Sequence, residues 1–445
     1  MIKVSVIMPC LNMVRYIKPC IDSVLQQTLS NIEILIIDAG STDGTLDILF
    51  EYKKQDSRIH IFHSSVKSYG YQMNWGISLA KGKYIGIVET DDIVEHNMFE
   101  LLYSEAISEN ADYVKGTSEG FFQSSHGIEW RFSILPCLDL KDKYTAIPKE
   151  NPELFLYDNF LWNGIYRREF LQKIKFNETP GAAFQDIGAL FQIASSADKG
   201  IYLNNHVYNY RQDNSSASSY DKKSFLYAAT EYRYIEQFLS NLSYEWEIVY
   251  YLKMGGLSIN RFLFMAGSGH YWNESKDGIE ELRNKLAYAV ADGKVNSNNF
   301  LNWEKLLIYL KEPYSLYETL RKEYCAKLEK MNFLLNISRN RCVYIFGAGN
   351  YGMFIHTFLS LNNIDVVAFC DNSTQKQLET IQNLPVLAPE ETISKKENAC
   401  YIITASKYVR EITDQLLQLG VEQNQIVFYN AGIDMYLLKE FEKEE

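Results

Sequence analysis

The chain lacks the features that mark secreted, membrane-spanning and disulfide-bonded proteins. Its 445 residues include seven cysteines, which are scattered, odd in number and without C-x-x-C spacing, so neither a disulfide framework nor a zinc site is expected. No run reaches the ~20 apolar residues of a membrane span. Residues 1–9 read as a strand, without the long apolar stretch and cleavage site of a signal peptide. We therefore expect a cytoplasmic protein, with peripheral contact at the inner face of a membrane left open.

Positive charge is also scarce. Lys and Arg number 44 against 56 Asp and Glu, which gives a net charge of -12. A general nucleic-acid-binding surface needs basic patches to neutralise phosphates, so no nucleic acid partner is expected. The length allows about two or three domains, and a hydrophobic content of 47% is ordinary for a globular protein.

The first 115 residues alternate between short apolar runs and segments with helical spacing. The runs predict strands at residues 4–8, 32–37, 58–62 and 84–88, and the spacing predicts helices at 16–27, 43–55 and 71–81. Strands that are apolar on both faces are typical of a parallel sheet covered by helices. Such α/β sheets bind ligands beyond the carboxyl ends of their strands.

Two predicted strands end in acidic segments. Residues 89–92 place three carboxylates within four positions, an arrangement that is stable when it is solvated, paired with cations or wrapped around a metal. A solvated turn is the simpler alternative. Residues 38–45 begin with Asp38 and contain glycines suited to a tight turn. Asp43 in that segment is equally explained as a charge in the first turn of a helix.

Taken in order, these segments resemble glycosyltransferase family 2 over about residues 1–215. The resemblance rests on Pro9, on residues 38–45, on residues 74–77 with 81–84, and on residues 89–92. It implies the GT-A fold and a nucleotide-sugar donor, with Asp38 near the base and the acidic turn as the motif that holds ribose and Mn²⁺ or Mg²⁺. The donor-binding residues that follow from it are Pro9, Asp38, Asp43, Glu89, Thr90, Asp91 and Arg211. The metal ligands are Asp91 and Asp92. Glu89 and Ala39 stand where the family commonly has Asp.

A further acidic residue, Asp186, lies at the predicted start of a helix. From the residues alone it is a favourable helix charge worth ~0.3–1 kcal/mol. The resemblance implies that this segment is the family's Glu-Asp motif, with Asp186 as the general base and Gln185 in place of the Glu. An inverting transfer needs such a base near an acceptor hydroxyl.

Residues 161–168 resemble the acceptor-side segment of the family. Trp162 suits stacking on a sugar and Arg167 suits a phosphate, while core packing is the alternative for the aromatic side chain. In residues 206–214, Arg211 is predicted to neutralise the diphosphate or to form an ion pair, and His206 is expected to be structural.

A serine-rich stretch at 215–219 predicts a boundary, and residues 222–336 have helical spacing without a paired catalytic group. This segment is expected to pack on or link its neighbours, with acceptor binding or homo-oligomer formation as alternatives. The predicted domains are therefore 1–215, a helical domain at 216–338, and 339–445.

The third domain begins with a strand and a G-x-G-x-x-G turn. Gly347, Gly349 and Gly352 form the turn, and Asp371 ends the next strand 19 positions later. This pattern is the dinucleotide fingerprint, so a second nucleotide is predicted here. The segment also resembles small Rossmann-like domains appended to sugar-modifying enzymes, and a structural or partner-docking domain is the alternative.

Together the sequence predicts an α/β protein and a metal-dependent, inverting glycosyltransferase of the hexosyltransferase type. Sugar would pass from a nucleoside diphosphate sugar to a hydroxyl of a glycan or lipid-linked precursor of a surface polysaccharide. Glu89, Ala39 and Gln185 keep open an inactive scaffold of polysaccharide assembly. A bifunctional enzyme with NAD-linked chemistry is disfavoured, because the third domain lacks a Tyr-x-x-x-Lys motif.

Overall fold

The computed structural model describes the chain except for residues 125–126, 135–142, 182, 215–220, 269–271 and 430–445. The described residues form two compact units. The first contains Met1–Gly120, Ser133–Phe262 and His270–Leu316, and the second contains Phe121–Phe132, Leu263–Gly269 and the chain from Tyr317 onward. Most of the helical segment therefore belongs to the same unit as the N-terminal sheet. The predicted division into three domains stays a prediction.

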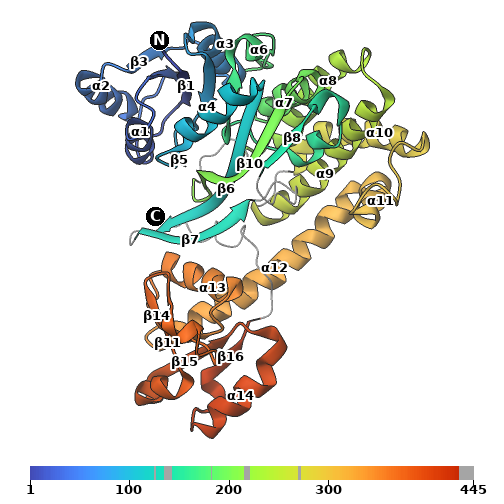
Figure 1. Ribbon diagram of the computed structural model, residues 1–445. Coiled ribbons are helices and arrows are strands. Elements are labelled where there is room, and N and C mark those ends of the chain that lie inside the picture. The colour runs from blue at the N-terminus through green and yellow to red at the C-terminus, as the bar shows by residue number, and fades with distance from the viewer. Residues whose placement is uncertain (125–126, 135–142, 182, 215–220, 269–271, 430–445) are drawn as a thin grey trace. The chain divides into compact units, whose positions relative to one another are not determined.

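The N-terminal sheet begins with four parallel strands, in the order β3-β2-β1-β4 (Figure 1). They are β1 (Val4–Cys10), β2 (Ile32–Asp38), β3 (Ile59–His63) and β4 (Tyr84–Ile87). All residues of β1, β2 and β4 are buried, as expected for near-continuous apolar runs in a parallel sheet. The four predicted strands are confirmed to within a few residues at their ends.

The sheet then continues in mixed directions. Among the described residues the order runs on from β4 through β9, β6 and β10 to β5, while β7 pairs with β6 and β8 pairs with β10. β9 is antiparallel to β4, so the sheet changes direction beside the strand that ends in the acidic turn. These strands are β5 (Ile93–Val94), β6 (Tyr113–Ser124), β7 (Gly127–Ile134), β8 (Lys143–Ala146), β9 (Gly164–Arg167) and β10 (Gly200–Arg211).

Helices cover this sheet and bury its apolar faces. The predicted helices 16–27, 43–55 and 71–81 are confirmed as α1, α2 and α3. The helices of this part are α1 (Ile17–Leu25), α2 (Thr45–Gln55), α3 (Tyr69–Leu79), α4 (Met98–Glu109), α5 (Leu154–Tyr157), α6 (Arg168–Leu171) and α7 (Gln185–Ser196), with a 3-10 turn at Pro148–Glu150. Ile21 of α1 and Phe99 of α4 pack with Val6 and Ile34 in one fully buried core. The predicted α/β architecture is thus observed.

The helical segment consists of helices that pack in two groups: the first four on one another and on α7, and most of the last in the core of the second unit. They are α8 (Ser224–Leu239), α9 (Tyr244–Ser268), α10 (Trp272–Ala291), α11 (Trp303–Lys311) and α12 (Pro313–Ser338). Trp246 of α9 meets Phe191 of α7 edge to face at 5.5 Å, and Tyr232 of α8 meets Tyr250 of α9 at 5.4 Å. Aromatic contacts of this kind account for much of the chain's aromatic content. None of the described helices combines the length and apolar character that a membrane crossing requires.

The second unit contains a separate sheet with the order β13-β14-β12-β11-β15-β16. The five strands from β14 to β16 are parallel, in the order 3-2-1-4-5, which matches five of the six strands in the doubly wound order 3-2-1-4-5-6. Its strands are β11 (Cys342–Phe346), β12 (Val366–Cys370), β13 (Thr380–Ile381), β14 (Leu384–Leu387), β15 (Ala399–Ile403) and β16 (Ile426–Phe428). The helices are α13 (Asn350–Leu361) and α14 (Val409–Gln418), with 3-10 turns at Lys376–Leu378, Pro389–Asn398, Ser406–Tyr408 and Gln423–Gln425.

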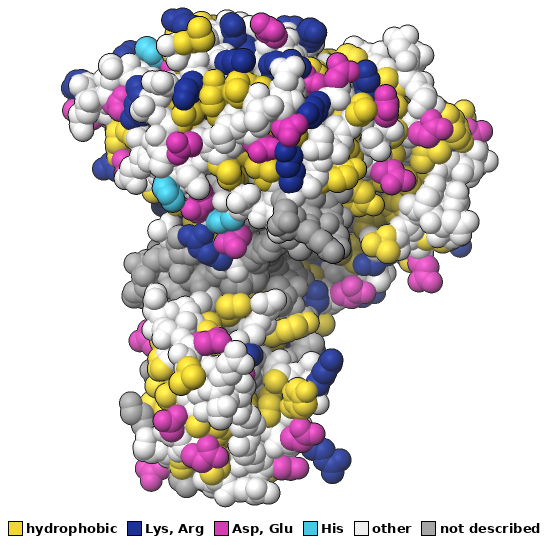
Figure 2. Space-filling view, in the orientation of Figure 1, with side chains coloured by type: hydrophobic (Ala, Val, Ile, Leu, Met, Phe, Trp, Pro, Cys, Tyr) yellow, Lys and Arg dark blue, Asp and Glu magenta, His cyan; other side chains and the backbone are white. Residues whose placement is uncertain are grey.

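Charged side chains of both signs are interspersed on the face shown in Figure 2, where neither Lys and Arg nor Asp and Glu gather into one large patch.

Candidate active site

The loop after β2 is shaped by the buried carboxylate of Asp38. Its Oδ2 accepts hydrogen bonds from the amides of Gly40 (2.9 Å) and Ser41 (3.1 Å), and the Ser41 hydroxyl donates to Oδ1. The exposed imidazole of His63 lies 3.3 Å from Oδ2. Asp38 thus fixes the turn at the carboxyl end of the strand, and its contact with a nucleotide base stays a prediction.

The loops after β1 and β2 are tied to each other. The side chain of Asn12 accepts from the Thr42 amide (2.9 Å), and Asp43 Oδ2 accepts from the Val14 amide (2.9 Å). Asp43 Oδ1 also accepts from the hydroxyl of Thr45 (2.6 Å), at the start of α2. Burial opposes the charge, but these hydrogen bonds outweigh it and lower the pKa of Asp43. Asp43 therefore braces the two loops as a permanent anion.

The acidic turn follows β4, and its first residue is Glu89. The Tyr69 hydroxyl, at the start of α3, donates to Glu89 Oε1 at 2.9 Å. Burial, with the nearby charges of Asp91 and Asp186, raises the pKa of Glu89 to about 8. Glu89 therefore lies near both Asp91 and Asp186, and its carboxyl is mostly protonated at neutral pH.

Thr90 joins this turn to the end of β1. Its hydroxyl donates to the main-chain carbonyl of Pro9 at 3.0 Å, and both residues are buried. Cys20 of α1 adds a second link, since its thiol donates to the Glu89 carbonyl at 3.4 Å. Two elements, β1 and α1, thus hold the backbone of the turn.

Asp92 is fully enclosed by protein groups. Its Oδ2 accepts from the Tyr208 hydroxyl (2.8 Å) and its Oδ1 accepts from the Arg211 amide (2.7 Å), both on β10. Burial, and then the charge of Asp91, raises the pKa of Asp92 well above its ordinary value. The structure therefore uses both oxygens of Asp92 to join the turn to β10.

Asp91, in contrast, is partly exposed. Its Oδ2 accepts from the Asn214 side chain (2.7 Å), and its carbonyl accepts from Arg211 Nε (2.8 Å). Burial raises the pKa of Asp91, against the opposing effect of Asn214. Arg211 itself is 3.1 Å from Asp213 and lies 4.9 Å from the centre of the Tyr16 ring, so the predicted ion pair is present.

The carboxylates of the acidic turn are the candidate ligands for a divalent cation. Among the described residues no group of three or more His, Cys, Asp or Glu side chains is arranged around a common metal position. One reachable carboxylate nevertheless suits Mg²⁺ or Mn²⁺ when the phosphates of a substrate and water supply the other ligands. The raised pKa values of Glu89, Asp91 and Asp92 also indicate a cluster that a cation would stabilise. The residues fit, with Asp91 as the ligand.

Asp186 occupies the first turn of α7, as the helical spacing predicts. The helix starts after Phe184, which has a left-handed φ of 69°. Burial raises the pKa of Asp186 to about 6, against the hydrogen bonds of its own amide and that of Ile187 and the charge of Lys253. The group is therefore ionised at neutral pH and able to accept a proton.

The start of α7 is connected to the acidic turn through α3. Gln185 Oε1 accepts from the Gly70 amide at 2.8 Å, and its Nε2 donates to the Thr179 carbonyl at 2.8 Å. The neighbouring Tyr69 donates to Glu89. Gln185, which replaces the family's Glu, thus ties the start of α7 to the start of α3 through buried hydrogen bonds.

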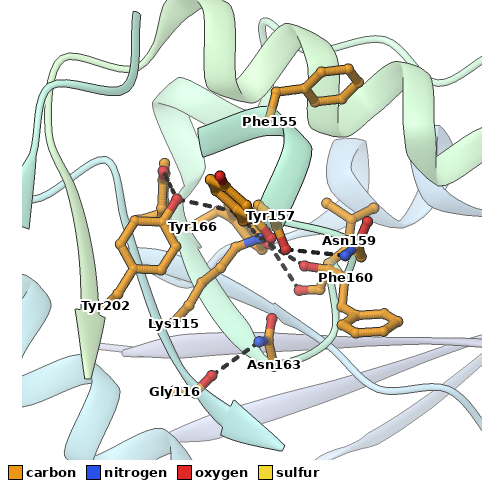
Figure 3. Close-up of polar contacts among 12 residues, drawn as sticks. Lys115, Gly116, Phe155, Tyr157, Asn159, Phe160, Asn163, Tyr166 and Tyr202 are labelled. Carbon is orange, nitrogen blue, oxygen red and sulfur yellow. Dashed lines mark hydrogen bonds and ion pairs between the residues drawn. The ribbon is translucent and has the colours of Figure 1, made fainter. Parts of the chain in front are cut away.

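Residues 155–163, the segment that precedes β9, are held by contacts with β6 (Figure 3). Lys115 of β6 is 1% exposed, and its Nζ donates to both oxygens of Asp158 (2.6 and 2.7 Å) and to the Phe160 carbonyl (2.7 Å). Asn163 donates to the Gly116 carbonyl at 3.0 Å. Burial lowers the pKa of Lys115, and Asp158 opposes this shift. A buried ion pair thus fixes residues 155–163, which overlap the start of the predicted acceptor-side segment, residues 161–168.

The two predicted acceptor residues lie apart from the acidic turn. Trp162 is 7% exposed and stacks on Phe160 (4.4 Å between ring centres) and Tyr208 (4.2 Å), as the core alternative predicts. Arg167 pairs with Asp112 and lies opposite Tyr84, at the amino end of β4. The proton-binding affinity of Arg167 is increased by Asp112 against the effect of burial, so its pKa is raised. Neither side chain joins Asp91 and Asp186.

The glycine turn of the second unit adjoins a cavity of about 430 Å³. Gly347 adopts a left-handed φ of 115°, and a Cβ at Gly352 would stand 2.1 Å from the Gly347 carbonyl. A Cβ at Gly349 would meet nothing within 4 Å. Asp371 Oδ2 accepts from the Ala348 amide (3.2 Å) and lies 3.3 Å from Lys376 Nζ. All four predicted residues, with Lys376, line the cavity.

Several residues of the site were not expected from the sequence. Tyr69 and Asn214 have no local signal, because an aromatic residue at a helix start and an amide in a loop are common. Lys115 carries a signal, since a lysine between Val114 and Gly116 interrupts an otherwise buried strand.

Comparison with known proteins supports this geometry. The profile of Glycosyl transferase family 2 matches residues 5–175. GlyG, a glycosyltransferase of Streptococcus pneumoniae, is 32% identical over 221 residues, which are 48% of this chain and 72% of the relative. The chain belongs to glycosyltransferase family 2. The glycosyltransferase EpsJ of Bacillus subtilis is also 32% identical, over 48% of this chain and 62% of its own length.

The fold agrees with this membership. The crystal structure of S. aureus TarS 1-349 in complex with UDP-GlcNAc superposes with a TM-score of 0.53 at 16% identity, covering 73% of this chain and 92% of that chain. The likeness shows a shared fold, and the predicted GT-A architecture is thereby confirmed. In the second unit, residues 339–427 match a different profile, described as C2185-like, N-terminal.

Proposed function

We propose that this glycosyltransferase moves a sugar, with inversion, from a nucleoside diphosphate sugar to a hydroxyl of a glycan or lipid-linked precursor of a surface polysaccharide. The observation that carries the proposal is the proximity of Asp186 to the acidic turn: its charge acts on Glu89, and Gln185 ties the start of α7 to α3, whose Tyr69 donates to Glu89. The names of GlyG, EpsJ and TarS support the general reaction. Action at the inner face of a membrane, where lipid-linked precursors are found, belongs to the same proposal.

Each group of residues in the proposed site has a distinct task in the proposed reaction. The loops around Asp38 and Asp43 bind the nucleoside, with Pro9 and Thr90 at the floor. Asp91 would hold the cation, which would supply positive charge to the departing diphosphate. Asp186 accepts the proton of the acceptor hydroxyl as that oxygen attacks the anomeric carbon from the opposite face.

The raised pKa of Asp186 suits this task. A general base works best when its pKa lies near the working pH, because it is then both ionised and basic. A value of about 6 leaves Asp186 mostly ionised at neutral pH and more basic than an exposed Asp.

The direct test is a panel of nucleotide sugars with and without Mn²⁺, read by release of nucleoside diphosphate. We expect release from at least one donor, only with the cation, and a parallel rise in thermal stability. If no donor is turned over but nucleotide sugars still bind, the protein is the scaffold that the sequence left open. The proposal is then wrong.

A second proposal concerns the cavity of the C-terminal unit, which we infer to bind a nucleotide. Its glycines occupy the three positions of the fingerprint: Gly347 in the tight turn, Gly349 facing open space and Gly352 against the Gly347 carbonyl. Twelve-residue α13 begins at this turn, so its free amides and Lys376 favour a phosphate. A cavity of about 430 Å³ is within the range of small-ligand sites.

A substitution at Gly349 tests this proposal. Gly349→Ala adds a methyl group to open space and should fold normally, yet it blocks the approach of a pyrophosphate. Thermal stabilisation of the full chain by NAD⁺ or UDP without metal should be present in the parent and lost in this variant. A parent that responds to neither nucleotide would assign the unit a structural or docking role.

A further inference from the structure

The helical segment reaches the first turn of α7, beside Asp186. Glu231 of α8 is 1% exposed, and its Oε1 accepts from the Gly188 amide at 3.0 Å while its Oε2 accepts from the Asn177 side chain at 2.9 Å. A Cβ at residue 188 would stand 2.1 Å from Glu231 Oε1. Glycine at this position therefore allows a carboxylate from another helix to bind the backbone two residues after Asp186.

Lys253 of α9 reaches the same region from the other side. Its Nζ donates to the Phe155 carbonyl (2.7 Å), to Asn159 Oδ1 (2.6 Å) and, at 3.2 Å, to the carbonyls of Leu156 and Asp158. These residues belong to the 155–163 segment, which Lys115 holds from β6 (Figure 3). Four oxygens around one ammonium form a built site rather than a chance surface contact.

The residue before α7 has a partner in α9 as well. The Arg261 guanidinium is 6% exposed and lies 5.4 Å from the centre of the Phe184 ring, while its Nη2 donates to Ser224 at 2.8 Å. Phe184 is the non-glycine residue with a left-handed φ that starts α7. The backbone conformation at the start of α7, beside Asp186, is therefore held by contacts from α9 as well as by Gln185.

We propose that α8 and α9 are part of the catalytic apparatus, with Lys253 and Glu231 as positioning residues for Asp186, and with Lys253 also holding the 155–163 segment. The proposal rests on the proposed role of Asp186 as the base. It assigns to the helical segment a task in the transfer reaction, beyond packing against the sheet.

The charges around Asp186 give the proposal a specific signature. The titratable groups that influence it or are influenced by it are Tyr69 of α3, Glu89 of the acidic turn, Glu231 and Lys253. Lys253 is the cation among them, and its charge lowers the pKa of Asp186 against the effect of burial. Burial, and then the charge of Asp186, raises the pKa of Glu231 to about 7, against its hydrogen bond from Asn177, so Glu231 is largely protonated where Asp186 titrates.

The test compares Lys253→Met, Lys253→Arg and Glu231→Ala in the full-length enzyme with Mn²⁺ and UDP-N-acetylglucosamine, or the donor found active. Lys253→Met should lower kcat about tenfold or more at unchanged donor KM, since small displacements of a reacting group are costly. It should also move the acid limb of the pH profile to higher pH. Lys253→Arg should restore the position of that limb, and Glu231→Ala should lower kcat without moving it.

A second measurement needs no donor. The pH dependence of carbodiimide labelling at Asp186, read by peptide mass spectrometry, should shift upward in Lys253→Met and stay in place in Lys253→Arg. Glu245→Gln, an exposed charge change on α9, is the matched control and should alter neither readout. If the limb and the labelling stay unmoved in a folded Lys253→Met variant, the inference fails. If Asp186→Asn keeps full activity, the proposed function fails instead.

Discussion

At the scale of single residues, Asp186 combines two properties that oppose each other. It is a helix first-turn carboxylate, a position that favours the charge, and it is partly shielded from water, which disfavours the charge. Burial is the larger effect, so the pKa rises to about 6. A residue that only served the helix would gain nothing from this environment, whereas a base gains proton affinity.

This balance predicts the behaviour of Asp186→Asn. Turnover should fall about 10²- to 10⁴-fold, the usual contribution of a general base, with donor binding retained. Because the folded-state pKa is raised, the ionised group lowers the free energy of unfolding above about pH 6. This destabilisation fades as the pH falls below about 6, where the folded-state carboxyl becomes protonated. The variant should therefore melt higher than the parent at pH 8, with the difference shrinking toward pH 5 in thermal unfolding. A variant with lower stability at pH 8 would contradict this account.

A second residue-scale prediction concerns the cation. Asp91→Asn should abolish the Mn²⁺-dependent thermal shift with UDP and the release of nucleotide, because the reachable carboxylate of the acidic turn is lost. Asp47→Asn, an exposed change in the first turn of α2, serves as the control and should behave as the parent. Metal-dependent binding that survives Asp91→Asn would move the cation site elsewhere.

The sequence predicted these carboxylates because they follow apolar runs and match motifs in order. It did not distinguish Asp91 from Asp92, since both were expected to bind the metal. Asp92 proves to be bound by Tyr208 and Arg211, residues more than a hundred positions away, and no local pattern reveals such partners. For Trp162 and Arg167, the stacking on Tyr208 and the pairing with Asp112 likewise depend on strand neighbours that a local pattern does not show.

At the scale of elements, the parallel strands were predicted from their apolar runs, and the helices between them from spacing. The antiparallel extension was not, because β9 and β10 reach the sheet through long-range pairing that a local pattern does not encode. The helical segment was recognised as helical, but its contacts with α7 were not. Glu231 and Lys253 look like ordinary surface charges in the sequence.

An element-scale prediction tests the buried pair behind the 155–163 segment. Lys115→Met leaves Asp158 buried without its cation and should destabilise the first unit by about 3–5 kcal/mol in urea unfolding. Adding Asp158→Asn to this variant removes the stranded charge and should recover more than half of the loss. A double variant as unstable as the single one would show that packing of the lysine, rather than its charge, is what matters.

At the scale of the whole molecule, the two units carry two proposed nucleotide sites of different character. The proposed site of the first would depend on a cation at Asp91, and the cavity of the second would rely on backbone amides and Lys376. Asp91→Asn should therefore lose only the metal-dependent thermal response to UDP, and Gly349→Ala only the metal-independent response to nucleotide. A single variant that removes both responses would show one shared site.

The proposed reaction is an inverting transfer with Asp186 as the base. The stereochemistry of donor hydrolysis tests it most directly. The parent, Mg²⁺ and each of several α-linked UDP-sugars are followed by proton NMR before the released sugar equilibrates. The account predicts that the β-anomer appears first and that Asp186→Asn releases none above background. First appearance of the α-anomer, or full activity in Asp186→Asn, would contradict it.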